Sequence, residues 1–371
     1  MKISIFWILL RFGAVSIMLL SCKGNTTVDS QVDHETPRIE FLNVPVYGEK
    51  GELTGSVVGL DPTEAKIAVY IFVNGWWTKP SLEFPLTNFD QNGFWQSDIT
   101  TGGVDEYATE IRAYVVPYDF SPEPVLGLET LPEIIETIAL AKIETTRSKP
   151  PKRRIFFSGY EWWVKSSPYA VGPGPNLFSD SQSSVWVDET DQLHLKIDKK
   201  ENLWRCAEVV SLSSFGYGTY RFYTRDGEAS FNENAVFGLF TWNDEPDFNH
   251  REIDVEFSRW GNPLNLNAQF VVQPWEKSGN VRRFEEIENS GISLHQFRWH
   301  ADRVEFESRS NVERGVLGSG ILTEKWVYSG EDLPMPGGET VRLNLWLLNG
   351  MPPSDDQSIS VTIAGFEFLP E

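Results

Sequence analysis

The sequence predicts an all-β protein built from two β-sandwiches, and three observations support this prediction. Short runs rich in β-branched and aromatic residues recur along the chain, and many of them alternate polar with apolar positions. Turn residues separate these runs, and a content of 29 Gly, 22 Pro and 13% aromatic residues suits a β-rich fold with many turns. The length of 371 residues leaves room for two domains.

Residues 1–21 are expected to be a lipoprotein signal peptide and lie outside the fold. A short apolar run follows Arg11, and Leu19-Leu20-Ser21-Cys22 resembles a bacterial lipobox. Cleavage before Cys22 and acylation of its thiol would attach the mature chain to a membrane of the bacterial cell envelope, which we expect to be the outer membrane. An uncleaved membrane anchor is the alternative, but the charge of Arg11 and the shortness of the run argue against it.

Residues 22–37 are polar and rich in turn formers, which predicts a flexible tether. Residues 38–147 are expected to form the smaller, immunoglobulin-like sandwich. Its clearest strand candidates are residues 66–73 and 110–116, and Asn74-Gly75 marks a tight turn after the first of them. Whether this module binds glycan stays open.

Residues 148–154 are basic and contain two prolines, which predicts a linker, although a patch for anionic glycans or lipids is the alternative. Residues 155–371 are expected to form one larger unit without sustained helical periodicity. So many strands require two packed sheets, and we expect a jelly roll with a cleft on its concave face. The strand candidates in this unit are residues 193–197, 218–224, 235–242, 252–257, 268–272, 297–299 and 341–347.

The charge balance restricts the partners of the chain. Asp and Glu number 53 against 32 Lys and Arg, and the formal charge of −21 argues against a nucleic-acid partner, because phosphates would be repelled. A neutral or weakly charged ligand such as a glycan is easier to accommodate. The five histidines show no metal-ligand spacing, so we expect no cofactor. We expect a monomer, and Cys206 would be a buried free thiol once Cys22 is acylated.

Residues 252–257 alternate carboxylate with apolar side chain, in the order Glu-Ile-Asp-Val-Glu-Phe. On a strand, the three carboxylates therefore share one face and the three apolar side chains share the other. Three like charges on one face repel each other, and a function that needs them is the simplest reason to keep them. The alternative is a single polar-faced strand in a very acidic protein.

The separation of the two Glu residues on this strand can be compared with that of the paired carboxyl groups in glycosidases. Glu252 and Glu256 have Cα atoms roughly 13 Å apart at about 3.3 Å per residue. If the two side chains lean together, their carboxyl groups approach to about 5 to 6 Å, the separation found in retaining glycosidases. Asp254 lies between them, where it would hydrogen-bond the nucleophile and where its charge would help to keep the other Glu protonated.

Several fragments within residues 155–370 resemble glycoside hydrolase family 16, especially its lichenase-like and laminarinase-like members. The resemblance implies a retaining, endo-acting β-glycanase on a concanavalin A-like jelly roll. It also implies that Glu252 is the nucleophile, Asp254 the assisting carboxylate and Glu256 the acid/base. The matching fragments are Cys206-Ala207-Glu208, Phe215-Gly216-Tyr217-Gly218-Thr219-Tyr220, Phe240-Thr241-Trp242, the strand at residues 252–257, Ala268-Gln269-Phe270 and Asn344-Leu345-Trp346.

The resemblance further implies a set of sugar-binding side chains, which comprises Glu208, Trp242, Gln269, Asn344 and Trp346. Aromatic faces suit the apolar C–H surface of a sugar ring, although core packing is the alternative role for each Trp.

The chain also departs from the lichenase pattern. His250 stands where Trp is common, and Val210 stands where Arg is expected. His250 and Trp260, which lies in an insertion, are expected to contribute to the binding surface. These departures alter the sugar-binding groups and leave the three carboxylates in place. Relatives carry a structural calcium ion, but no residue of this sequence specifies one.

Two functions from different classes follow. The first is hydrolysis of internal bonds in a polysaccharide, either a β-glucan such as laminarin or lichenan or a related galactan. The second is a non-catalytic surface carbohydrate-binding lipoprotein that uses the same sandwich. The sequence leaves the linkage and the endo or exo mode open.

Overall fold

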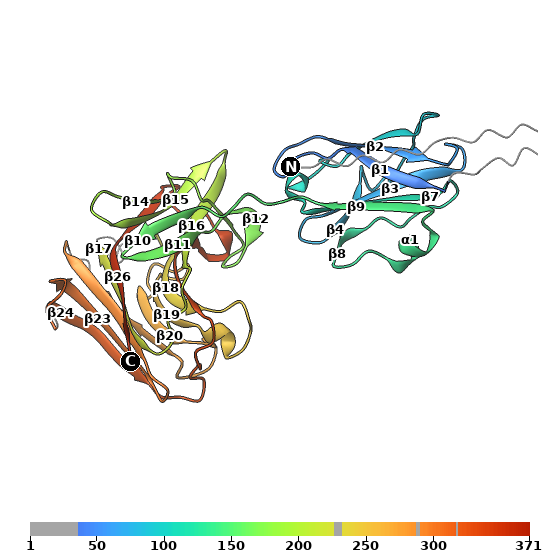
Figure 1. The fold of residues 1–371 in the computed structure, drawn as a ribbon. Coiled ribbons are helices and arrows are strands. Elements are labelled where there is room, and N and C mark those ends of the chain that lie inside the picture. The colour runs from blue at the N-terminus through green and yellow to red at the C-terminus, as the bar shows by residue number, and fades with distance from the viewer. Residues whose placement is uncertain (1–35, 226–231, 287–289, 317) are drawn as a thin grey trace, which may run out of the picture.

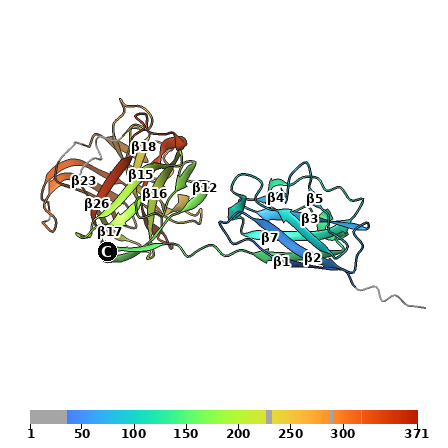
Figure 2. The ribbon, with the colours of Figure 1, turned by 90° about the horizontal axis from the view of Figure 1, so that it is seen from above.

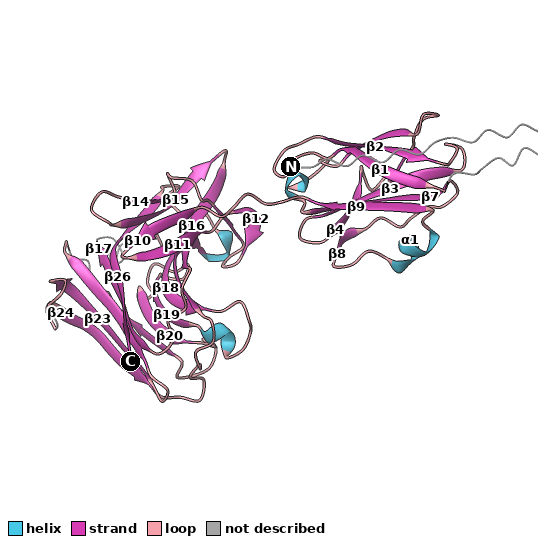
Figure 3. Cartoon of the chain, in the orientation of Figure 1, coloured by secondary structure: helices cyan, strands magenta, loops and turns pink. Residues whose placement is uncertain are grey.

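The computed structural model describes residues 36–225, 232–286, 290–316 and 318–371. Figure 3 shows strands throughout, with only a few short helical segments, and the predicted all-β sandwich class is confirmed. Within the described residues, no helix has the length and apolar character needed to cross a membrane. The predicted signal peptide and the lipid-attachment residue Cys22 lie outside the described residues.

The N-terminal part of the described chain contains two sheets. The smaller sheet has the order β1-β2-β6, and the larger has the order β8-β4-β3-β7-β9 with β5 paired to β3. The strands are β1 (Arg38–Asn43), β2 (Glu52–Val58), β3 (Ala65–Phe72), β4 (Trp76–Lys79), β5 (Leu86–Thr87), β6 (Phe94–Asp98), β7 (Glu110–Pro117), β8 (Leu126–Leu128) and β9 (Ala141–Thr146), and the helical segments are η1 (Asp105–Tyr107) and α1 (Glu133–Ile138).

A hydrophobic core between these sheets contains the fully buried Trp95 and residues of β3 and β7. Asn74 and Gly75 both adopt positive φ, as the tight turn between β3 and β4 requires. Trp76 is buried and makes an edge contact with Phe72, so it serves packing here. The immunoglobulin-like class of this module and the domain boundaries stay predictions.

The C-terminal part forms two long ladders of paired strands. One runs β10-β11-β16-β25-β18-β19-β20-β21, and the other runs β14-β15-β26-β17-β22-β23-β24. The strands are β10 (Arg154–Phe157), β11 (Tyr160–Val164), β12 (Ser167–Val171), β13 (Asn176–Phe178), β14 (Val185–Val187), β15 (Leu193–Lys200), β16 (Leu203–Ser211), β17 (Gly218–Arg225), β18 (Ala235–Trp242), β19 (Ile253–Phe257), β20 (Ala268–Val272), β21 (Val281–Phe284), β22 (Ile292–Trp299), β23 (Val304–Val312), β24 (Ile321–Tyr328), β25 (Thr340–Leu347) and β26 (Ile359–Pro370), with the short segments η3 (Asn249–Arg251) and η4 (Leu348–Gly350).

The core of this larger unit is built from the apolar faces of both ladders. Ile253, Val255 and Phe257 of β19 are fully buried in it, as the alternation of this strand predicts. Burial of each such side chain contributes about 1.5 to 3 kcal/mol. Cys206 is a free, fully buried thiol whose pKa burial raises to about 12, so it behaves as a small apolar residue.

The segment between β9 and β10 joins the two parts of the chain, which lie side by side in both ribbon views (Figures 1 and 2). Buried Arg147 holds its start by donating to the carbonyl oxygens of Ala108 and Asp105. Arg153 holds its end by donating to the carbonyl oxygens of Asp180 and Val185. Tyr169 of β12 packs against the core of the N-terminal part, so the two parts also touch directly.

Candidate active site

A cavity of about 580 Å³ opens on the ladder that contains β19. Glu252, Asp254 and Glu256 all line it. Glu252 comes directly before β19 but has extended backbone angles, so the alternation of side chains continues through it. The carboxylate face of this segment therefore points into one cavity, and its apolar face fills the core.

The floor of the cavity is a row of residues contributed by neighbouring strands. Glu256 pairs with Gly238 of β18, Gly238 pairs with Asn344 of β25, and Asn344 pairs with Glu208 of β16. On the other side, Glu256 pairs with Gln269 of β20. Directly opposed residues on adjacent strands have Cβ atoms about 4.5 to 5.5 Å apart, so register alone brings these residues together.

Gly238 is required by close packing in this row. A Cβ atom at this position would lie 2.6 Å from Oδ1 of Asn344, which is closer than van der Waals contact allows. The absence of a side chain leaves space between Glu256 and Asn344 at the floor of the cavity.

Glu256 accepts a hydrogen bond from the amide nitrogen of Gln269 at 2.8 Å. Arg283 in turn donates to the amide oxygen of Gln269 at 3.2 Å, which fixes the orientation of that amide. Burial raises the pKa of Glu256 to about 7, although the Gln269 hydrogen bond and the charge of Arg283 oppose this rise. Glu256 therefore gains or loses a proton near neutral pH.

Asp254 accepts a hydrogen bond from the amide nitrogen of Gln273 at 3.1 Å and also bonds Glu252. Burial, followed by repulsion from Glu252 and Glu256, raises the pKa of Asp254 well above its ordinary value. Its hydrogen bond with Glu252 raises the pKa of Asp254 and lowers that of Glu252, which is the pattern of a protonated Asp254 donating to an ionised Glu252.

Glu252 is subject to opposing effects. Burial and the neighbouring Glu256 raise its pKa to about 8, and the Asp254 hydrogen bond and the positive charge of Arg342 act to lower it. Three coupled carboxyl groups this close together cannot all be ionised near neutral pH. The hydrogen bond between Asp254 and Glu252 matches the contact expected from the sequence, and the raised pKa of Asp254 favours its protonated form as the donor.

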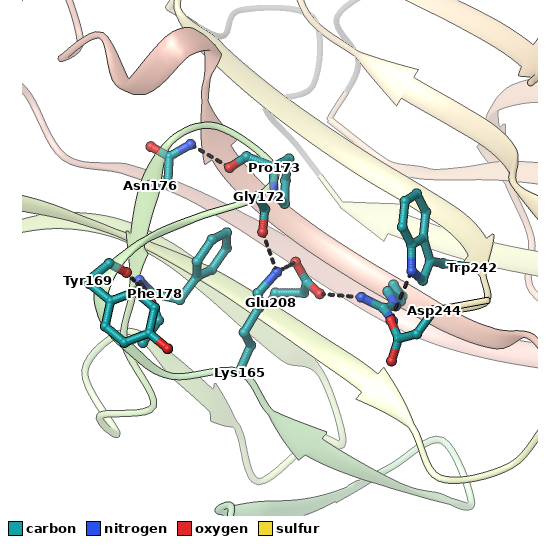
Figure 4. Close-up of polar contacts among 11 residues, drawn as sticks. Lys165, Tyr169, Gly172, Pro173, Asn176, Phe178, Glu208, Trp242 and Asp244 are labelled. Atoms are coloured by element: carbon teal, nitrogen blue, oxygen red, sulfur yellow. Dashed lines mark hydrogen bonds and ion pairs between the residues drawn. The ribbon is translucent and has the colours of Figure 1, made fainter. Parts of the chain in front are cut away.

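Glu208 is completely buried between two cations (Figure 4). Lys165 approaches one carboxylate oxygen at 2.8 Å and Arg342 approaches the other at 3.4 Å. Lys165 also donates to the carbonyl oxygen of Gly172. Both oxygens of Glu208 are therefore engaged by the protein, and its charge offsets part of the positive charge of Lys165 and Arg342.

Trp242 lines the cavity and is held from several sides. The His250 ring stacks on it with centroids 4.1 Å apart and an interplanar angle of 6°. The indole nitrogen of Trp242 donates to Asp244 (Figure 4), which also pairs with Arg342 at 2.9 Å. His250 acts on the cavity through Trp242, because it does not itself line the cavity.

Asn344 and Trp346 lie on the same face of β25 as Arg342 and line the cavity with it. Oδ1 of Asn344 is buried and has no hydrogen-bond partner among the residues that the structure describes. A buried amide oxygen without a partner costs about 1 to 3 kcal/mol, so a ligand that donates to it would recover this free energy.

Of the ten side chains predicted to catalyse or bind, three do not line the cavity. Gln269 contacts Glu256 and His250 contacts Trp242, so both reach the site through a neighbour. Trp260 is half-buried in the turn after β19. The residues that do line it are Glu208, Trp242, Glu252, Asp254, Glu256, Asn344 and Trp346.

Sequence reasoning missed several residues of the site. Arg342 and Gln273 could have been found from strand periodicity, because Arg342 lies two residues before Asn344 and Gln273 lies four residues after Gln269. Arg342 pairs with Val210 across the ladder, so it supplies a positive charge beside the position where Arg was expected. Lys165 and Trp163 follow no local pattern that links them to the carboxylates.

Among the described residues, no cluster of His, Cys, Asp and Glu could hold a metal ion.

No protein-family model and no curated protein matches the chain. Similar solved structures include a β-glucanase of Bacillus licheniformis, with 15% identity, 58% of this chain and 95% of that chain covered, and a TM-score of 0.42. A pseudo β-1,3-glucanase antigen of Mycobacterium tuberculosis has 18% identity, coverage of 57% and 91%, and a TM-score of 0.43. A β-1,3-1,4-glucanase (lichenase) from a mouse hindgut metagenome has 16% identity, coverage of 58% and 96%, and a TM-score of 0.43.

Proposed function

We propose that the chain is a retaining glycoside hydrolase that cleaves internal β-glycosidic bonds of a polysaccharide, either a β-glucan or a related galactan. The observation that supports this most is the convergence of three differently bonded carboxyl groups on one cavity. Trp242 and Trp346 offer aromatic surfaces for sugar rings in the same cavity, and Asn344 offers an unpartnered amide oxygen.

In the proposed first step, a carboxylate oxygen of Glu252 attacks the anomeric carbon, and Glu256 donates its proton to the departing glycosidic oxygen. This step needs Glu252 ionised and Glu256 protonated, which reverses the order of the raised pKa values of about 8 for Glu252 and about 7 for Glu256, so the proposal requires that proton sharing with Asp254 favours an ionised Glu252. A protonated Asp254 supports this state, because its hydrogen bond stabilises the negative charge of Glu252. The three groups then carry one negative charge between them, which also limits their mutual repulsion.

In the second step, Glu256 takes a proton from water, and the resulting nucleophile attacks the anomeric carbon. The bond to Glu252 breaks, and its carboxylate is restored. Because Glu256 acts first as an acid and then as a base, a pKa near neutrality suits both roles.

Replacing Glu252 with Gln tests the assignment. The variant keeps the shape of the side chain and removes the nucleophile, so release of reducing ends from laminarin, lichenan, agarose and κ-carrageenan should fall by about three orders of magnitude or more for whichever glycan the wild type cuts. Glu245→Gln is the matched control, because Glu245 is an exposed carboxylate that does not line the cavity.

Undiminished turnover in Glu252→Gln would rule out Glu252 as the nucleophile. Retention of a glycan by the wild type without any new reducing ends would instead support the non-catalytic carbohydrate-binding protein.

A further inference from the structure

One end of the cavity carries positive charges that the proposed reaction does not use. Lys149 and Lys152, from the segment between β9 and β10, line the same cavity as the three carboxylates. Among the described residues, neither lysine has a carboxylate within ion-pair distance, whereas Lys165 pairs with Glu208 and Arg342 pairs with both Glu208 and Asp244. The two linker lysines are therefore available to a ligand.

The surrounding structure holds the side chain of Lys152 at the cavity. The ammonium group of Lys152 lies 3.6 Å from the centre of the Trp163 ring, a cation–π contact that keeps it against the wall. The next residue, Arg153, is fixed by its bonds to the carbonyl oxygens of Asp180 and Val185. Arg147 fixes the other end of the segment, so the linker has little freedom to carry its lysines away.

The positive charge continues beyond the first cavity. An adjoining cavity of about 680 Å³ shares Lys149, Lys152 and Trp163 with the first and adds Lys200 and Arg205. Within the described part of the chain, the ammonium group of Lys200 donates to the hydroxyl groups of Ser181 and Ser183, and these neutral contacts do not compensate its charge. The acidic residues that line this adjoining cavity are Asp180 and Glu201, so cations outnumber anions there.

The distance from the reaction centre follows from the strand order. Trp163 pairs with Val210, which pairs with Arg342, and the same row continues through Phe240 to Asp254. Four strand spacings of about 4.8 Å separate Trp163 from Asp254, or roughly 19 Å. An anionic group held by Lys152 would therefore lie several sugar units from the bond that is cut.

We propose that Lys149 and Lys152 bind an anionic substituent, a sulfate ester or a carboxylate, so that the substrate of the proposed hydrolase is an acidic polysaccharide. In a chain with a net charge of −21, a positively charged end of the cleft provides local attraction that the rest of the surface does not. Asp244 in the same cavity senses the charge of Lys152, but a neutral glycan would leave both lysines without an ion-pair partner among the described residues. This inference rests on the proposed function for the identity of the ligand as a glycan.

The test measures binding by calorimetry in a Glu252→Gln background, so it does not depend on cleavage. The probes are laminarin, sulfated laminarin, C6-carboxylated laminarin, κ-carrageenan and desulfated κ-carrageenan. Lys149→Ala/Lys152→Ala should weaken binding of the charged form of a glycan by about tenfold and leave the uncharged form unchanged. Added NaCl should reduce the difference between the two forms, because salt screens exposed charges.

The control is Lys50→Ala/Lys325→Ala, which removes two exposed lysines that line neither cavity. Comparison of the sulfated and carboxylated laminarins identifies which anion is preferred. The inference would be overturned if Lys149→Ala/Lys152→Ala lost the same binding affinity for charged and uncharged glycans, or if the control variant lost as much. It would also be overturned if the unsubstituted lysine pair showed no preference for any charged glycan. Charged-glycan binding without hydrolysis by the wild type would preserve it while refuting the hydrolase proposal.

Discussion

At the level of single residues, the site depends on where two protons reside among three neighbouring carboxyl groups. The strand alternation suggested that Glu252, Asp254 and Glu256 face together, and they do line one cavity. Their individual environments differ because Gln273 contacts Asp254 and Gln269 contacts Glu256. These amide contacts come from another strand, so the spacing within residues 252–256 could not show them.

Removing the Gln269 side chain should change the pH profile of the proposed reaction. Gln269 donates to Glu256 and lowers its pKa, so Gln269→Ala should raise that pKa and move the alkaline limb of kcat/KM upward by about half a unit to one unit. The wild-type limb should lie near pH 7, because Glu256 must be protonated to act as the acid. The measurement is a kcat/KM profile between pH 5 and 10.

Gln273→Ala is the matched control for this shift, because Gln273 contacts Asp254 and not Glu256. A downward shift in Gln269→Ala, or an equal upward shift in Gln273→Ala, would contradict the assigned role of the Gln269 contact.

At the scale of secondary-structure elements, strand register assembles the site. The row Gln269, Glu256, Gly238, Asn344 and Glu208 crosses five strands, of which β18, β19 and β20 are consecutive and β16 and β25 come from other parts of the sequence. Each strand was predictable from its own alternation of side chains. The partner of each strand was not, because pairing depends on long-range contacts that local periodicity does not contain.

The turn before β19 also has a local structure that the sequence did not indicate. Residues 248–251 all adopt positive φ, between 52° and 62°. Non-glycine residues in this region cost of order 1 kcal/mol each and persist where surrounding contacts fix them. The side chain of Arg251 donates to the carbonyl oxygen of Met335, and the carbonyl oxygen of Arg251 accepts a hydrogen bond from the Thr241 hydroxyl. The turn places His250 against Trp242.

The stability of the fold should depend on Lys165, which follows β11 and pairs with the buried Glu208. Lys165→Met removes its 2.8 Å partner and leaves a fully buried carboxylate with Arg342 alone, so the free energy of unfolding at pH 7 should fall by about 2 to 4 kcal/mol. Urea denaturation of the full chain followed by tryptophan fluorescence measures this change.

The control is Lys199→Met, because Lys199 pairs with the exposed Asp356. Surface ion pairs contribute about 0 to 1 kcal/mol, so this variant should remain close to the wild type. Equal effects of the two substitutions would show that the buried Glu208 does not need Lys165.

For the molecule as a whole, the three carboxyl groups of the cavity are expected to reduce stability at neutral and alkaline pH. Burial raises the pKa of Glu252 to about 8 and that of Glu256 to about 7 in the folded chain. Between the ordinary Glu pKa, about 4.3, and these raised values, the folded chain binds more protons than the unfolded chain. Stability therefore falls as the pH rises through this window.

Glu256→Gln should remove part of this pH dependence. The variant should unfold like the wild type at pH 4 and be more stable at pH 8 by about 1 to 3 kcal/mol, because an amide has no proton to lose. Urea unfolding at both pH values tests this, with Glu245→Gln as the exposed control. A variant less stable than the wild type at pH 8 would show that an ionised Glu256 stabilises the fold.

Alternation along a strand is a local property, so the sequence was enough to predict the all-β class, several of the longer strands and the face on which the three carboxylates lie. It also indicated seven of the residues that line the cavity. Only the tertiary structure decided that both Glu208 oxygens are engaged by cations, that Gln269 and Gln273 serve different carboxyl groups, and that linker lysines reach the cavity. These features depend on strand pairing and on contacts between segments that are far apart in the sequence, and local spacing in the sequence predicts neither.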